Sequence, residues 1–201
     1  MPLSARLDSG YDSAMHRLVL VFISALLCCP LSAAELDAVT APAAPLTAER
    51  FDCENAFDLV AMMVVASCAV YQAPAAGDAV LSAARARLRD EQLASVEELT
   101  QTTIAFCPLA AGTGMVPTPH QLYLDDGLLT MSADGLAEIL AHELEHVQQF
   151  ARLGTRQFKC EYVREMLACG GCQDRGHGLE AAAYQRQDHV RARLSAAAAG
   201  R

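Results

Sequence analysis

Residues 132–153 constrain the fold most strongly, because they predict one long helix whose two sides differ in character. Ser132 is a good N-cap and Gly154 is a natural end, so the helix has defined limits. One side of this helix is an apolar stripe that would dock it into a core, and it consists of Leu136, Leu140, Leu144 and Val147. The other side carries two histidines and two acids in the stretch "HELEH", which packing into a core does not require.

The histidine pair predicts a zinc site. His142 and His146 are four residues apart, so a helix projects both rings from one line and both can bind one ion. Glu143 is rotated by about 100° from His142, beside the open position of such an ion, where it could act as a general base. The alternative is a surface helix with solvated charges and incidental histidines. Only five histidines follow residue 34, and two of them have this spacing with an acid between them, which favours the site.

A catalytic zinc site needs a third protein ligand. Glu180 is favoured, because it follows a Gly-rich turn that could swing the next helix across the first, and because the alanines at 181–183 permit close approach. A carboxylate there leaves the fourth position for water, as in catalytic sites. His177 is the main rival, and the other downstream candidates are Glu161, Glu165, Asp188 and His189.

Two residues could stabilise the oxyanion that forms when water attacks a peptide carbonyl. Tyr184 lies one helical turn after Glu180 on the same face, and His177 precedes the same helix. The alternative for Tyr184 is an aromatic ring that packs without a chemical role.

The N-terminus predicts an export signal. From Met15 the chain shows His-Arg, an apolar run at 18–27 and then small residues, with cleavage expected after Ala34. The run is too short to span a bilayer stably, and a lipoprotein anchor at Cys28 is disfavoured by the bulky leucine before it. The sequence therefore predicts a periplasmic or extracellular protein with no stable membrane span in the mature chain.

Six cysteines follow the expected cleavage: Cys53, Cys68, Cys107, Cys160, Cys169 and Cys172. An even number behind a signal peptide indicates disulfides and an oxidising compartment. If 53–68 is helical, Cys53 and Cys68 lie too far apart to bond, and the pairing is otherwise open. The stretch "CGGCQDRGH" at 169–177 offers two alternatives, a zinc knuckle completed by Cys160 or a thiol oxidoreductase.

Helical segments surround a short region of strands. The expected helices are 54–71, 78–99, 132–153, 156–169 and 179–194. The expected strands are 102–107, 121–126 and 127–132, with a Gly/Pro loop at 108–120. An extended peptide could add to 121–126 as an edge strand. This order of elements predicts an α+β fold in one disulfide-stabilised domain at 51–201. The domain follows a leader at 1–34, which contains the signal peptide at about 15–34, and an Ala/Pro-rich linker at 35–50.

The charge balance limits the classes of partner. Lys and Arg total 15 against 24 Asp and Glu, a net charge of −9, so no basic patch is available for nucleic acid. A hydrophobic content of 53% supplies ample material for a core. Nucleic acid is therefore not an expected partner, and the peptide or protein substrate that we expect instead follows from the zinc-hydrolase motif.

The chain resembles the gluzincin class of metallopeptidases, since HExxH is followed by a Glu 34 residues beyond the second histidine. More narrowly, it resembles the extracellular contractile-injection-system core domain family over roughly 120–190. The resemblance rests on "LAEILAHELEHVQQFARLG", on Phe158 and Tyr162, and on "GLEAAAYQ". It implies a zincin-like fold, zinc-dependent peptide hydrolysis and a downstream acid at Glu180. The residues that match its H-E-L-x-H-V-x-Q stretch are His142, Glu143, Leu144, His146, Val147 and Gln149.

A catalytically silent zinc-binding or interaction domain of a secreted or injection-system-associated protein is the alternative. Glu143 favours the enzyme, because a structural zinc site needs no base.

Overall fold

The computed structural model describes residues 52–69, 71, 76–109, 112–168, 175 and 178–200, which belong to one compact unit. In chain order its elements are α2 (Cys53–Ala69), α3 (Ala76–Asp90), α4 (Val96–Gln101), β1 (Thr103–Cys107), β2 (Gly114–Thr118), β3 (Gln121–Asp125), the 3-10 helix η3 (Asp126–Thr130), α5 (Ala133–Leu153), α6 (Thr155–Ala168) and α7 (Gly178–Ala199). Many helices around one small sheet confirm the α+β class. The predictions that lie outside the described residues concern the leader at 1–34, the linker at 35–50, Cys169, Cys172 and His177.

The three strands form one sheet in the order β1-β3-β2. β1 runs parallel to β3, and β2 runs antiparallel to it. The prediction that 121–126 forms an open edge is therefore wrong, because β3 is bonded on both sides. β2 instead forms an edge, and it falls in 108–120, where glycine and proline predict a loop. Pro117 within β2 has no N–H to donate, which an edge strand tolerates.

Two further segments differ from the prediction. Residues 127–132 predict a third strand, but η3 occupies this segment because an Asp-Gly pair begins a tight turn there. The single helix predicted at 78–99 is divided into α3 and α4. Ser95 begins the new helix with a capping box, in which its Oγ accepts from the N–H of Glu98 (3.1 Å) and its own N–H donates to the Glu98 carboxylate (2.9 Å).

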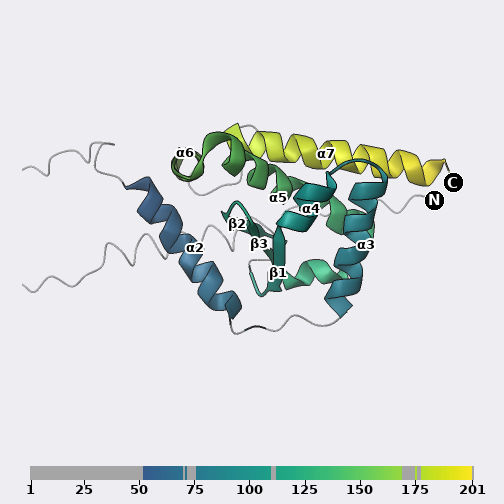
Figure 1. Ribbon diagram of the computed structural model, residues 1–201, viewed down its shortest axis with the longest axis horizontal. Helices are drawn as coiled ribbons and strands as arrows, with labels where there is room; N and C mark the ends of the chain where they lie inside the picture. The colour runs from purple at the N-terminus through teal and green to yellow at the C-terminus, as the bar shows by residue number, and fades with distance from the viewer. Residues whose placement is uncertain are drawn as a thin grey trace, which may run out of the picture. The chain divides into compact units, whose positions relative to one another are not determined.

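α5 lies at the centre of the unit, with α7 packed along one side and α3 against another (Figure 1). The predicted apolar stripe is confirmed, since Leu136, Leu140 and Leu144 are fully buried and Val147 is partly buried against the same core. They join the residues of α3 and of the sheet in one hydrophobic core. α7 continues to Ala199, beyond the predicted end at 194, because alanine has the highest helix propensity.

Disulfides hold α2 at both ends. The Cys53–Cys160 bridge joins its first residue to α6, and the Cys68–Cys107 bridge joins its last turn to β1. The two bridges confirm that Cys53 and Cys68 do not bond each other, and they exclude Cys160 from a zinc knuckle. The buried side chains of α2 are only Phe57, Ala61 and Cys68.

Two observations bear on where the protein resides. Disulfides persist in oxidising compartments, so these bridges point to an exported protein. Within the described ranges, no helix combines the length and the apolar content needed to cross a membrane.

Candidate metal centre

The two histidines of α5 lie one helical turn apart and face into the protein. α5 begins as predicted, where Ser132 Oγ accepts a hydrogen bond from the N–H of Gly135 at 3.1 Å. Because the leucine stripe occupies the core, His142 and His146 project toward the other side. Their rings contact aromatic side chains of α7 and α6, and the two imidazole centroids lie 5.0 Å apart.

α7 supplies a third side chain, Glu180, from its first turn. Nε2 of His142 lies 3.3 Å from one carboxylate oxygen, and Nε2 of His146 lies 3.5 Å from the other. Ligand atoms on a tetrahedral zinc ion with bonds of about 2.1 Å are about 3.4 Å apart, which matches both spacings. The three side chains offer ligand atoms within 4.8 Å of one another, and each residue is only 5% exposed. The predicted ligands therefore form one buried group that could hold a metal ion.

Three polar atoms of this group are left without hydrogen bonds within the described residues. Among the described residues, neither carboxylate oxygen of Glu180 has a hydrogen-bond partner, and neither does Nδ1 of His142. The contacts between Glu180 and the two histidine rings are ion-pair contacts outside hydrogen-bond geometry. A buried carboxylate without hydrogen bonds is costly unless a cation neutralises it. The donor set therefore fits a divalent cation placed between the three side chains.

The charges within the group depend on one another. Burial alone would raise the pKa of Glu180, but contact with the two histidines lowers it to about 2. Burial alone would lower the pKa of His146, but contact with Glu180 and the charge of Glu143 raise it to about 9. Without a metal, the group is therefore held together by a carboxylate and a protonated imidazole. A bound cation would displace that proton.

Glu143 lies beside the group rather than in it. Its buried carboxylate rests against Gly114 of β2, where an added Cβ would lie only 2.4 Å from Oε1. Burial raises the pKa of Glu143, and the charges of His142 and His146 offset only part of that rise. A carboxylate whose pKa is raised is a stronger base, as the predicted role requires.

A small cavity of about 20 Å³ opens between these side chains. That volume is enough for one water molecule or one ion. Apolar side chains form much of its wall, so the polar groups meet in a setting where charge interactions are strong. The lining residues are Phe57, Gly114, Met115, Val116, His142, Glu143, His146, Phe158, Tyr162 and Glu180.

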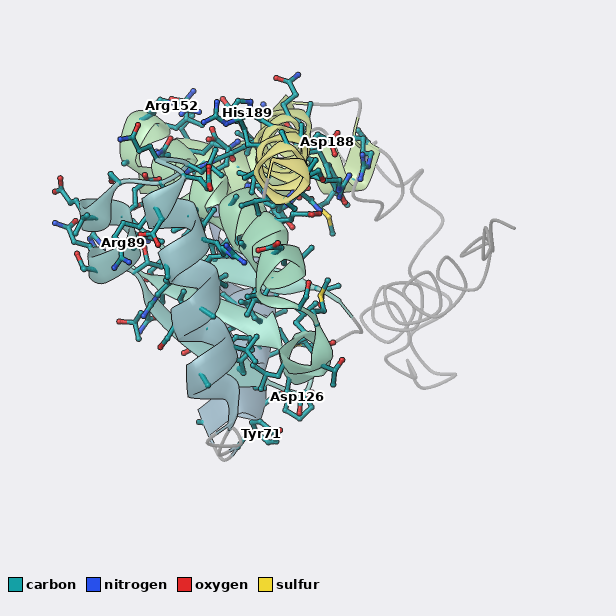
Figure 2. The ribbon with its side chains drawn as sticks, turned by 90° about the vertical axis from the view of Figure 1, so that its right-hand side faces the viewer. Tyr71, Arg89, Asp126, Arg152, Asp188 and His189 are labelled. Carbon is teal, nitrogen blue, oxygen red and sulfur yellow. A yellow bond between two sulfur atoms is a disulfide. The ribbon has the colours of Figure 1, made fainter. Side chains whose placement is uncertain are left out.

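The other downstream candidates lie elsewhere. Glu165 caps the first turn of α7, where its oxygens accept from one backbone N–H at 3.1 and 3.0 Å. Glu161 accepts a side-chain hydrogen bond within α6. Asp188 and His189 lie on the exposed surface of α7 (Figure 2). His177 falls outside the described residues, so its two predicted roles stay predictions.

The ring of Tyr184 packs against the ring of His142 in a T-shaped contact. Its centroid lies 4.6 Å from that of His142, and the guanidinium of Arg175 lies 4.4 Å from the same ring. Burial raises the pKa of the Tyr184 hydroxyl. Its contribution to an oxyanion site stays a prediction, and its ring packs against a candidate ligand.

Sequence reasoning assigned no role at the site to Gln149 and Tyr162. Oε1 of Gln149 lies 2.8 Å from Nδ1 of His146, and the Tyr162 ring lines the cavity with its centroid 6.1 Å from that of His146. Helical spacing could have found Gln149, because it lies three residues after His146 on the same face. The place of Tyr162 at the site could not be predicted in this way, because it depends on how α6 packs against α5.

Comparisons with known proteins identify no relative. No protein-family profile, no curated protein and no solved structure matches the chain. The family of the chain therefore stays a prediction from its motif.

Proposed function

We propose that this chain is an exported zinc metallopeptidase of the gluzincin type, with a zincin-like fold, that hydrolyses peptide bonds in peptide or protein substrates. The observation that carries the proposal is the buried group of His142, His146 and Glu180 with Glu143 beside it at one cavity. The resemblance of its motif to the extracellular contractile-injection-system core domain family supports the same activity.

Zinc suits this donor set, because two imidazoles and one carboxylate are a ligand combination of catalytic zinc sites. His142, His146 and Glu180 would hold the ion. Bound there, zinc would polarise a peptide carbonyl and lower the pKa of a water molecule. The apolar wall would keep bulk water away from the reacting groups.

Glu143 would accept a proton from the attacking water and deliver it to the leaving amine nitrogen. Its raised pKa supports this role, since the carboxylate holds a proton more readily than a solvated one. The absence of a side chain at Gly114 leaves room for the carboxylate beside the cavity. Tyr184 and His177 are the candidates for stabilising the oxyanion, on the opposite helix or in the segment before it.

The substrate backbone would add to β2. This strand forms an edge of the sheet, and its residues Met115 and Val116 line the cavity. An extended peptide can pair with such an edge through main-chain hydrogen bonds. Pro117 offers no N–H, so pairing would weaken beyond Val116.

One observation favours the alternative of a silent zinc-binding or interaction domain. The cavity has room for about one water molecule, so it offers little space for a substrate carbonyl beside an ion. Binding of zinc and hydrolysis must therefore be measured separately.

Metal analysis of the purified mature chain, followed by cleavage assays on unfolded proteins and a mixed peptide library, tests the proposal. We expect one zinc per chain in the wild type and loss of zinc in Glu180→Ala. Glu143→Gln should keep its zinc and lose at least about 100-fold in turnover. A wild type that binds no zinc would refute the metal site. Equal turnover in Glu143→Gln would refute the mechanism, and zinc binding without any cleavage would favour the silent domain.

Export is tested by expressing the full chain in a bacterial host and sequencing the N-terminus of the periplasmic product. We expect the mature protein to begin at Glu35. Retention of the intact chain in the cytoplasm would contradict the signal peptide proposed for residues 15–34.

A further inference from the structure

Gln149 is a fully buried polar side chain that uses both ends of its amide. Oε1 lies 2.8 Å from Nδ1 of His146, and Nε2 lies 2.8 Å from the backbone oxygen of Leu179. The first contact lies within α5, and the second crosses to the first turn of α7. A buried amide is stable only when its groups are paired, so both contacts contribute to holding it in place.

The direction of the amide follows from chemistry. A backbone carbonyl oxygen can only accept, so the NH₂ of Gln149 must face Leu179. The amide oxygen then faces His146 and can only accept, so Nδ1 of His146 must carry a proton. When the imidazole is neutral, its lone pair is therefore on Nε2, the atom that lies 3.5 Å from Glu180.

The same amide acts on the third ligand through the backbone. Leu179 immediately precedes Glu180, and its carbonyl accepts from Gln149. Its N–H donates to both oxygens of Glu165 in α6. Side chains of two different helices therefore hold this residue at its N–H and at its C=O. These contacts fix the first turn of α7 in place, and the side chain of Glu180 extends from that turn toward the two histidines.

The two histidines differ in this respect. Nδ1 of His142 has no hydrogen-bond partner among the described residues. The ring of His142 is instead restrained by contact with Tyr184, whose centroid lies 4.6 Å away. Outer hydrogen bonds that fix the tautomer and orientation of a ligand strengthen metal binding. His146 has such a bond, and His142 has none within the part of the chain that the structure describes.

We propose that Gln149 is the positioning residue of the metal centre, because one amide sets the proton on His146 and the place of Glu180 together. This inference rests on the proposed metal site. It does not depend on peptide hydrolysis, since its effect lies in how tightly and in what geometry the ion is held.

The variant that tests it is Gln149→Met, which keeps the length of the side chain and removes both hydrogen bonds. We expect zinc affinity, measured by competition with a chromophoric chelator, to fall by about 10- to 100-fold. Gln187→Met is the matched control, because Gln187 is also a buried glutamine on a packed helix and lies outside the metal group. It should leave zinc affinity within about twofold of wild type.

A spectroscopic readout separates positioning from general loosening of the fold. In zinc-loaded wild type with ¹⁵N-labelled histidine, NMR should show His146 protonated at Nδ1. The visible absorption bands of the cobalt-substituted protein should correspond to a single coordination geometry. In Gln149→Met the Nδ1 proton should exchange rapidly with water and the cobalt bands should shift. Wild type that binds zinc while Gln149→Met matches it in affinity and spectra would overturn the inference and leave the metal site standing. Wild type that binds no zinc would overturn both.

Discussion

Removing the Cys53–Cys160 bridge should loosen one wall of the metal cavity. The bridge fastens α2 to α6, and α2 contributes Phe57 to the cavity wall. The ring of Phe57 meets those of Phe158 and Tyr162 edge-on, with centroids 6.1 and 5.8 Å apart. The double variant Cys53→Ser with Cys160→Ser removes the bridge and leaves these contacts in place.

The loop lengths give the magnitude. The bridge closes 107 residues, so the chain-entropy relation gives a loss of about 4.8 kcal/mol in the free energy of unfolding. Burial of Phe57 contributes only about 2 to 3 kcal/mol, so the bridge should contribute more to the free energy of unfolding than the packing of this side chain does. The Cys68–Cys107 bridge closes 39 residues and should be worth about 3.9 kcal/mol. The difference of about 0.9 kcal/mol depends only on the ratio of the two loop lengths.

Guanidinium unfolding of the two double-serine variants, each in zinc and in chelator, measures these losses. We expect the Cys53–Cys160 variant to lose about 4 to 5 kcal/mol, to melt about 10 to 20 °C lower, and to release zinc to a chelator faster than wild type. The Cys68–Cys107 variant is the control for the loss of a bridge as such. A loss below about 1 kcal/mol, or a larger loss in the control, would refute the reasoning that the bridge acts by restricting the unfolded chain.

Three further predictions concern the site. The pKa of His146 is raised from 6.5 to about 9, so its contribution to the stability of the metal-free protein is complete below pH 6.5 and is lost as pH rises toward 9. Urea unfolding in chelator should therefore show a lower free energy of unfolding at pH 9 than at pH 6.5, and added zinc should remove most of that difference. Gly178→Ala should cost about 1 to 2 kcal/mol in thermal unfolding, because Gly178 has φ +43° and an added Cβ would displace the Glu165 carboxylate from the N–H of Leu179. Gly114→Ala should keep its zinc but lose about 100-fold in turnover, since the Glu143 carboxylate would have to move by about 1 Å; unchanged turnover would contradict its placement.

The features that the sequence predicts well are those carried by one helix. Four-residue spacing places His142 and His146 together, and the same period places the leucine stripe on the other side. Ser132 and Gly154 mark the ends of α5 within one residue of the observed bounds. For these features the information is local, since neighbours along the chain decide the geometry. Glu180 is the exception, because it lies on another helix. The glycine-rich sequence before it and the alanines after it favoured it among the downstream acids.

The features that escape prediction depend on contacts between distant segments. β2 has the composition of a loop, and it becomes a strand because β3 offers it a partner. The cysteine pairing depends on where α6 and β1 lie relative to α2, which no spacing along the chain encodes. The role of Gln149 depends on the carbonyl of Leu179, 30 residues away on another helix.

The candidate metal ligands come from two helices, so the binding of an ion there would be coupled to the docking of α7 on α5. Arg186 fixes that docking away from the site, where it pairs with Glu98 at 2.9 Å and lies 3.7 Å from Glu145. These ion pairs are partly buried and involve none of the candidate ligands, so we expect them to hold α7 in place before an ion binds. The Glu180 end of α7 differs, because among the described side chains only the two imidazoles offset the burial of its carboxylate. We therefore expect a bound ion to stabilise mainly the first turns of α7, so that hydrogen exchange in chelator becomes faster there while the segment near Arg186 stays protected.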